Sequence, residues 1–133
     1  MNYKVNYILI VVIVVTIGLF ADYYYRPYIY TNNIYDFHLA DTISSWVCVI
    51  GAPFFSLIMQ SFPKRELQVI LQSILAMYLV EFIQLIPPLG TFDWYDVIAT
   101  FIGSFITLGI YYRIGREKIE LKIFLRRLSG SKN

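Results

Sequence analysis

Four apolar runs joined by short polar segments predict an all-α integral membrane protein, folded as one four-helix bundle over residues 1–133. Of the 133 residues, 58% are hydrophobic and only 15% are charged. A soluble domain carries roughly 25% charged residues, so this composition indicates a chain that faces lipid. Twelve tyrosines add to the pattern, because tyrosine favours the membrane–water interface.

The runs themselves give the predicted spans, at residues 5–21, 42–62, 67–86 and 97–112. A spanning helix needs about 20 apolar residues, and about 17 still suffice. The first run is expected to be a retained helix, because its end at Ala21 lacks the small-residue pair of a signal-peptide cleavage site. Pro53 predicts a kink in the second run. Residues 22–41 are rich in Tyr, Asn and polar groups, which predicts a loop along the headgroup layer.

A separate, short basic helix is expected at residues 116–128, after the fourth span. Its apolar side chains fall at i, i+3, i+4 and i+7, which places them on one face of a helix. Its basic side chains lie largely off that face, a pattern typical of a helix on an anionic membrane surface. The apolar positions are Leu121, Phe124, Leu125 and Leu128, and the basic ones are Lys118, Lys122, Arg126 and Arg127.

The charge distribution predicts that both termini are cytoplasmic. Ten of the eleven basic residues fall in the N-terminus, the second connection and the C-terminus, and the exception is Arg26. Basic segments stay on the cytoplasmic side of a bacterial inner or plasma membrane. The acids show the opposite trend, since six of the nine belong to the other half: Asp22, Asp36, Asp41, Glu81, Asp93 and Asp96.

These acids predict an extracytoplasmic ligand-binding pocket. Acidic side chains next to hydrocarbon are costly and usually have a partner or a function. Glu81 and Gln84 share a helix face at i, i+3. The candidate ligand-binding residues are Glu81, Gln84, Asp93 and Asp96, with Asp36, His38 and Asp41 nearby.

Structural roles compete with this interpretation for each residue. Glu81 and Gln84 would also serve to hydrogen-bond neighbouring helices and fix the bundle. Asp93 or Asp96 would serve as a helix N-cap. His38 is the only histidine in the chain and would equally be an ordinary surface residue. Asp36 and Asp41 would equally be solvated acids of a loop.

Asp96 begins a stripe of small and polar residues on the fourth span, which continues with Thr100, Gly103 and Thr107. Such a stripe suits close helix packing. We expect it to face the third span and so to bring Asp96 close to Glu81.

The chemistry available to this pocket is limited. Nothing resembles a Ser/His/Asp or Cys/His nucleophilic arrangement, a phosphate-binding Gly loop or a zinc pattern, so no enzyme activity and no cofactor are expected. The carboxylates would suit a hard divalent cation, although no spacing matches a known metal-binding loop. The lipid bilayer is the expected partner, and the C-terminal basic residues suit lipid headgroups better than nucleic acid.

Glu81-x-x-Gln84, followed by Asp93-x-x-Asp96 and by Gly103, resembles the VanZ-like family. The acidic stretch Asp36–Asp41, with His38 inside it, is similar to a stretch that the family carries before its second helix. The resemblance covers roughly residues 36–103 and implies a small four-helix bacterial inner-membrane protein, related to one linked with teicoplanin resistance. Two departures are visible: the Arg that the family commonly has before Asp93 is absent from residues 90–92, and Thr100 stands where the family often has Asn.

Together these observations favour a non-enzymatic membrane protein whose pocket binds an envelope component or a lipid-linked ligand. A small ion- or proton-coupled transporter is the alternative, and four helices would then have to form a homo-oligomer to make a pathway. A membrane enzyme that acts on lipid-linked substrates with a carboxylate base is a third hypothesis.

Overall fold

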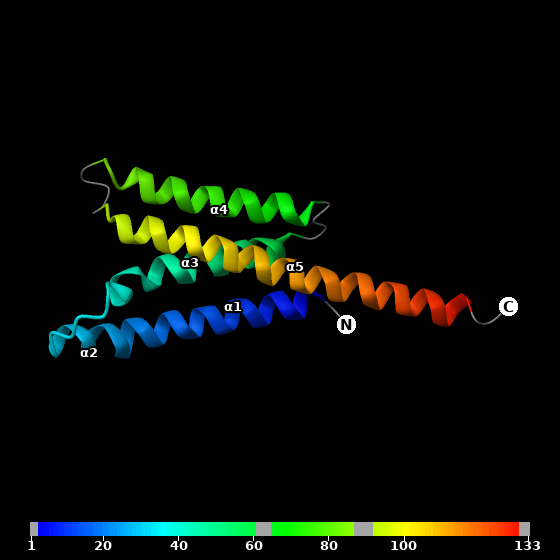
Figure 1. Cartoon of the computed structure of the whole chain (residues 1–133), viewed down its shortest axis with the longest axis horizontal. Helices are drawn as coiled ribbons and strands as arrows, with labels where there is room; N and C mark the ends of the chain where they lie inside the picture. The colour runs from blue at the N-terminus through cyan, green and yellow to red at the C-terminus, as the bar shows by residue number, and fades with distance from the viewer. Residues whose placement is uncertain (1–2, 61–64, 87–91, 131–133) are drawn as a thin grey trace.

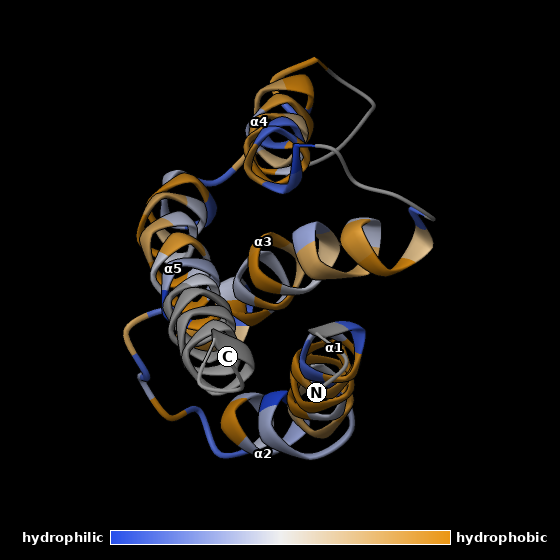
Figure 2. Cartoon of the chain, turned by 90° about the vertical axis from the view of Figure 1, so that its right-hand side faces the viewer, coloured by the Kyte–Doolittle hydropathy of each residue, from blue (hydrophilic) through white to orange (hydrophobic). Residues whose placement is uncertain are grey.

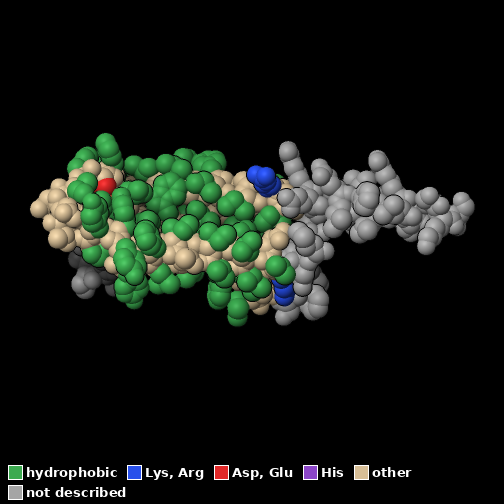
Figure 3. Space-filling model, turned by 90° about the horizontal axis from the view of Figure 1, so that it is seen from below, with side chains coloured by type: hydrophobic (Ala, Val, Ile, Leu, Met, Phe, Trp, Pro, Cys, Tyr) green, Lys and Arg blue, Asp and Glu red, His purple; other side chains and the backbone are tan. Residues whose placement is uncertain are grey.

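The structure, a computed structural model, describes the backbone of residues 3–60, 65–86 and 92–130 and the side chains of residues 4–60, 65–86 and 92–115. Over these ranges it is helical and contains no strand. Four helices are long and apolar enough to cross a membrane, by length and composition: Lys4–Thr31, Leu39–Met59, Glu66–Ile83 and Trp94–Gly115. The prediction of four apolar helices is therefore confirmed. Hydrophobic side chains cover the face shown in Figure 3 along most of its length.

The first helix is longer than the sequence predicted. Helix α1 (Tyr3–Phe20) continues through a π-helical turn, η1 (Ala21–Tyr25), into α2 (Arg26–Thr31). The expected loop at residues 22–41 was therefore wrong over its first ten residues, and also over its last three, which belong to the helix Leu39–Met59. Pro27 has no backbone N–H and so cannot donate a hydrogen bond to the preceding turn. In the π turn before it, the Arg26 N–H donates to Ala21 O, and this wider turn lets the helix continue past the proline. At 1.5 Å per residue the 28 residues extend about 42 Å, further than a hydrocarbon core of about 30 Å.

Helix α3 (Leu39–Met59) is the centre of the bundle. It contacts α1, α4 (Glu66–Ile83) and α5 (Trp94–Gly130). In Figure 2, which looks nearly along α1, α4 and α5, the C-terminal part of α3 turns aside from the other axes. This change of direction agrees with the kink predicted at Pro53, which lies inside the helix.

Two contacts let α3 approach its neighbours closely. A Cβ built on Gly103 of α5 would clash with Val49 Cγ1, so α5 meets α3 at a position where any larger residue requires Val49 to shift. On the other side, a Cβ on Gly18 of α1 would lie 3.2 Å from the Val47 methyls. Small residues at such crossings are how helices associate in lipid, where apolar burial adds little.

Helix α5 is continuous from Trp94 to Gly130. The separate basic helix expected at residues 116–128 was therefore wrong as a separate element, although its residues are helical; its side-chain pattern lies outside the described side chains. A single glycine such as Gly115 lowers helix stability by only about 1 kcal/mol relative to alanine. The residues that follow it have high helix propensity, so the helix continues. Figure 1 shows α5 extending past the end of the bundle where the N-terminus also lies.

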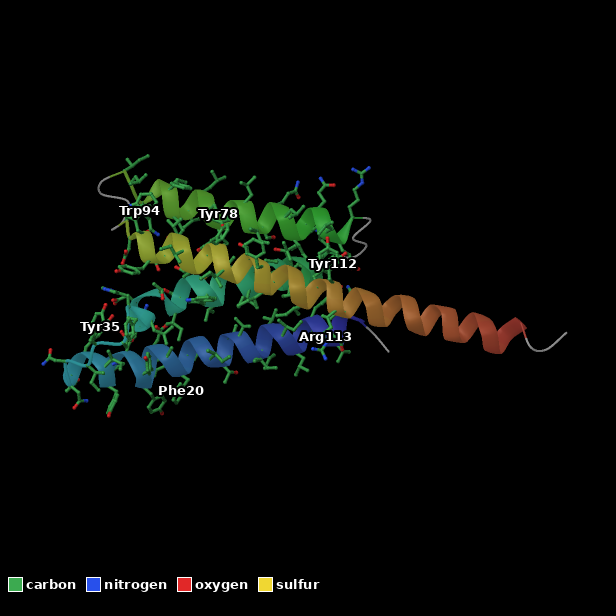
Figure 4. All side chains as sticks on the ribbon, in the orientation of Figure 1. Phe20, Tyr35, Tyr78, Trp94, Tyr112 and Arg113 are labelled. Carbon is green, nitrogen blue, oxygen red and sulfur yellow. The ribbon has the colours of Figure 1, made fainter. Side chains whose placement is uncertain are left out.

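The two ends of the bundle differ in chemistry. Figure 4 shows Tyr35 and Trp94 at one end, and Tyr112 and Arg113 at the other. We call the end that carries Tyr35 and Trp94 the acidic end, and the end that carries both chain termini the basic end. The described acids at the acidic end are Asp22, Asp36, Asp41, Glu81, Asp93 and Asp96, and the described bases at the basic end are Lys4, Arg65 and Arg113. The predicted turn at Pro63-Lys64 and the bend at residues 87–90 lie outside the described residues.

Candidate functional site

Three helices bring two acids to one hydroxyl group at the acidic end. Ser45 Oγ of α3 lies 3.1 Å from Glu81 Oε1 of α4 and 2.9 Å from Asp96 Oδ1 of α5. Glu81 is buried, with 4% of its surface exposed, and Asp96 is half-buried. We refer to Ser45, Glu81 and Asp96 as the carboxyl cluster.

Each member is placed by its helix. Glu81 occupies the last turn of α4, on the side that is buried against α3. Asp96 lies in the first turn of α5, where the helix dipole favours a negative charge. Ser45 lies one turn after Thr42 on the buried side of α3. The serine thus comes from the central helix and reaches both outer helices.

Proton counting limits what the carboxyl cluster can be. A serine hydroxyl has one proton and accepts through two lone pairs. It therefore donates to one carboxylate at a time, and both hydrogen bonds form together only when one carboxyl carries a proton and donates it to Ser45 Oγ. The closed arrangement with both bonds formed would accordingly hold one proton between two acids.

Thr100 adds a fourth oxygen-bearing side chain beside this cluster. It lies one turn after Asp96 on α5, and its side chain is fully buried. Its hydroxyl approaches the Glu81 carboxyl, yet Thr100 Oγ1 makes no hydrogen bond to any described residue. A buried hydroxyl without a hydrogen-bond partner destabilises the folded state by on the order of 1–3 kcal/mol. Most buried polar groups have a partner, so Thr100 departs from the usual pattern.

Four further groups contribute to the electrostatics. Asp41 and Asp93 repel a negative charge on Asp96, Arg26 attracts it, and the Cys48 thiol lies near Glu81. Arg26 is nonetheless bound elsewhere. Its guanidinium donates to Asp22 Oδ1 (2.9 Å), to the carbonyls of Ala40 (2.6 Å) and Asp41 (3.0 Å) and to Ser44 Oγ (3.3 Å). The carboxyl cluster therefore has no base in direct contact among the described residues.

The predicted site residues of the polar stretch, Asp36, His38 and Asp41, form a second group that joins α2 to α3. Asp36 Oδ2 accepts from Tyr25 OH at 3.1 Å and from the Ala40 N–H at 2.7 Å. Asp41 accepts from Tyr30 OH and lies 3.3 Å from His38 Nδ1. These carboxylates thus bind tyrosines of α2 and η1 and the first turn of α3, rather than the carboxyl cluster.

His38 also connects this group to α5. It precedes α3 in a left-handed backbone conformation (φ 61°). Its ring stacks on Tyr95, with centroids 4.2 Å apart and planes 15° from parallel. The pair lies near a hollow of about 390 Å³ between α3 and α5, which is lined by Asp36, Phe37, Leu39, Thr42, Trp46, Tyr95, Ile98 and Ala99.

Asp93 and Gln84 have local roles in the structure. Asp93 Oδ1 accepts the Tyr95 N–H at 2.9 Å, at the start of α5. Of the two acids considered as N-caps, Asp93 is therefore the one that caps. Gln84 is the C-cap residue of α4, and no hydrogen bond joins its amide to the described residues of the carboxyl cluster.

The expectation that the small and polar stripe of α5 brings Asp96 close to Glu81 of α4 is confirmed, since both acids lie at Ser45 Oγ. Further along the stripe, however, the residues face α3 and not α4. Gly103 meets Val49, and Thr107 Oγ1 lies 3.0 Å from Val49 O and 2.9 Å from Gly103 O. Val49 is four residues before Pro53, which has no N–H to donate to this carbonyl. Thr107 has one hydroxyl proton for the two carbonyls, and when it donates to Val49 O it supplies a hydrogen bond that the backbone of α3 cannot make.

Ser45 is the site residue that the sequence interpretation missed, and Thr100 was assigned to packing alone. The available signal was the pair Thr42 and Ser45, two polar residues one turn apart at the start of an apolar run. Among the described residues, no group of three or more His, Cys, Asp or Glu side chains is arranged to hold a metal ion.

Comparison with known proteins adds no relative, since no family model, no curated protein and no solved structure matches the chain.

Proposed function

We propose that this chain is a multi-pass membrane protein that binds a cationic group of an envelope component or lipid-linked ligand at the carboxyl cluster, and that it releases a proton on binding. The observation that carries the proposal is Ser45 Oγ, which lies within hydrogen-bond distance of Glu81 and Asp96 from two other helices. Two acids that share one proton provide a negative site as soon as the proton leaves.

The cationic nature of the ligand follows from charge balance. A carboxylate pair in a low-dielectric region is costly unless a positive charge compensates it. The nearest described base, Arg26, is engaged with four oxygen atoms outside the cluster. A positive group that enters from the acidic end would compensate the pair once the proton has left.

The sidedness is part of the same proposal. We place the acidic end on the extracytoplasmic face and the two termini in the cytoplasm, because ten of the eleven basic residues belong to the terminal segments and the connection between α3 and α4. An envelope role in a VanZ-like protein is also proposed, on the motif Glu81-x-x-Gln84 and Asp93-x-x-Asp96 alone.

The test uses an amine-bearing lipid as the probe. Short-chain phosphatidylethanolamine is titrated into the full chain in weakly buffered non-ionic detergent with a pH indicator, and short-chain phosphatidylglycerol is the control lipid. We expect saturable proton release with the amine lipid, which is abolished in Glu81→Gln and Asp96→Asn and weakened in Ser45→Ala. Asp22→Asn, which removes an exposed acid of the same end outside the cluster, should release protons as the unmodified chain does.

Equal proton release in Glu81→Gln and in the unmodified chain would exclude the carboxyl cluster as the binding site. A proton-coupled transporter is the second candidate, favoured by the shared proton beside the buried Glu81. It requires an oligomer, and it is distinguished by Glu81-dependent acidification of proteoliposomes down a ligand gradient.

A further inference from the structure

The unpartnered hydroxyl of Thr100 is the feature of the site that proton sharing leaves unexplained. Within the carboxyl cluster, Ser45 Oγ contacts one oxygen atom of each acid. Thr100 Oγ1 lies fully buried beside Glu81 and has no hydrogen-bond partner among the described residues. A bound ligand other than the proton, to which Thr100 Oγ1 could coordinate, would explain the presence of this oxygen atom.

The chemistry of these groups specifies that occupant. Ser45 Oγ and Thr100 Oγ1 have lone pairs, and the Glu81 and Asp96 carboxylates add negative oxygen atoms. Neither nitrogen nor a basic side chain contributes a direct contact among the described residues, and hard cations are the species that prefer oxygen ligands alone. A proton joins only two of these oxygen atoms at once, whereas a metal cation takes several oxygen ligands.

We propose that Ser45, Glu81, Asp96 and Thr100 form a sodium site, at which Na⁺ replaces the shared proton. The inference rests on the proposed function, since it uses the same cluster, and it names an inorganic occupant for it. In the exchange, a carboxylic acid of the cluster gives its proton to water, and Na⁺ takes its place between the carboxylate and hydroxyl oxygen atoms. The charge of the site is the same before and after.

A monovalent ion fits this site better than a divalent one. Ca²⁺ takes 6–8 oxygen ligands, and Mg²⁺ requires a near-octahedral set of six. The described side chains supply oxygen atoms from four groups, and replacement of one proton by one Na⁺ leaves the second acid's charge as it was. A divalent ion would change the charge of the site by one unit in the same exchange.

Trp46 provides a signal for occupancy. It follows Ser45 on α3, and its ring lies 3.6 Å from a Cβ built on Gly103, at the seam between α3 and α5. The chain has two tryptophans, and Trp94 is exposed at the end of the bundle. In a Trp94→Phe background, fluorescence therefore reports on the neighbourhood of the site.

The experiment titrates NaCl into this Trp94→Phe protein at constant ionic strength, with KCl as the balancing salt, and records Trp46 fluorescence and proton release. We expect a saturable response to Na⁺ that becomes weaker as the pH falls, because protons compete for the site. Thr100→Val keeps the shape but removes the oxygen, and its Na⁺ affinity should fall roughly 10–100-fold. Thr100→Ser restores the oxygen and should bind close to the parent.

The results separate this inference from the proposed function. Equal Na⁺ affinity in Thr100→Val and in the parent would overturn the sodium site, as would a response to K⁺ of the same strength. Proton release by phosphatidylethanolamine without any Na⁺ response would overturn the sodium site and leave the proposed function standing. Absence of both responses, in protein that elutes as one folded species, would overturn both.

Discussion

At the scale of single residues, the most important side chains are those that form hydrogen bonds between helices. Ser45 Oγ hydrogen-bonds to two acids on two helices. Thr107 hydrogen-bonds to the Val49 carbonyl, for which Pro53 has no N–H. In a lipid environment water does not replace such bonds, so the protein must supply them itself. These short hydroxyl side chains therefore connect the helices in a way that apolar residues of similar size cannot.

The Thr107–Pro53 relation leads to a stability prediction. Thr107→Val should lower the free energy of unfolding by about 0.6 kcal/mol, the average for hydrogen bonds between membrane helices, and by at most about 1.7 kcal/mol. In a Pro53→Ala background the same change should cost less, because the alanine substituted at position 53 has a backbone N–H that would donate to Val49 O. The measurement is a double-mutant cycle of thermal or denaturant unfolding in detergent.

The reference for that cycle is Thr16→Val on α1, since the Thr16 hydroxyl donates to Val12 O of its own helix. Its effect should not depend on residue 53. An identical effect of Thr107→Val in both backgrounds would show that the hydroxyl does not compensate for the proline.

At the scale of elements, α3 determines the bundle. It contacts α1, α4 and α5, and its close crossings use Gly103 on one side and Gly18 on the other. The carboxyl cluster depends on this arrangement, because Ser45 lies between α4 and α5 only while α5 is seated against α3. A substitution at the α3–α5 crossing should therefore alter the geometry of the carboxyl cluster, which lies further along the same two helices.

Gly103→Ala tests this dependence. The added methyl would meet Val49 Cγ1, and overpacking of this kind typically costs about 1–3 kcal/mol. We expect a lower melting temperature in detergent, together with weaker proton release on ligand binding. Val49→Ala, combined with Gly103→Ala, should recover most of the loss because it removes the opposing methyls.

Gly109→Ala is the matched control on the same helix. A Cβ at Gly109 meets nothing within 4 Å, and alanine has the higher helix propensity. This variant should be neutral or slightly more stable. Equal destabilisation by both substitutions would mean that helix propensity, and not the α3–α5 contact, controls the effect.

At the scale of the whole molecule, the four helices place both termini at one end and the carboxyl cluster at the other. Helix α5 and the α1–η1–α2 helix are each longer than a hydrocarbon core, and they protrude at opposite ends. The long extension of α5 therefore lies at one end of the bundle, and a tyrosine-rich acidic surface lies at the other. The protein's proposed orientation can be measured directly.

The orientation is tested by cysteine labelling in intact cells. Cys48 is the only cysteine, so Cys48→Ala gives a cysteine-free background. We expect Asn33→Cys, which follows α2, to react with a membrane-impermeant maleimide in intact cells, and Arg65→Cys, which precedes α4, to react only after permeabilisation. The reverse pattern would invert the proposed topology and place the carboxyl cluster on the cytoplasmic side.

The site could be predicted only in part, and the reason is clear from individual residues. Glu81 and Asp96 stand out in the sequence because acids are rare in apolar runs. Ser45 does not stand out, since a serine in a spanning helix usually bonds to its own backbone. Asp36 and Asp41 carry the same chemistry as Asp96, but their partners are tyrosines of a helix that the sequence interpretation had taken for a loop.

Composition and the lengths of the apolar runs by themselves determined that four helices form, because a backbone in lipid has to satisfy its hydrogen bonds within each segment. They also determined that most of the acids lie at one end of the bundle. Only the tertiary structure decided which helices touch: α5 packs on α3, where Gly103 allows close approach, so Ser45 lies between Glu81 and Asp96. Contacts between helices depend on the fit of facing surfaces, and a pattern along one chain does not specify which surfaces face each other.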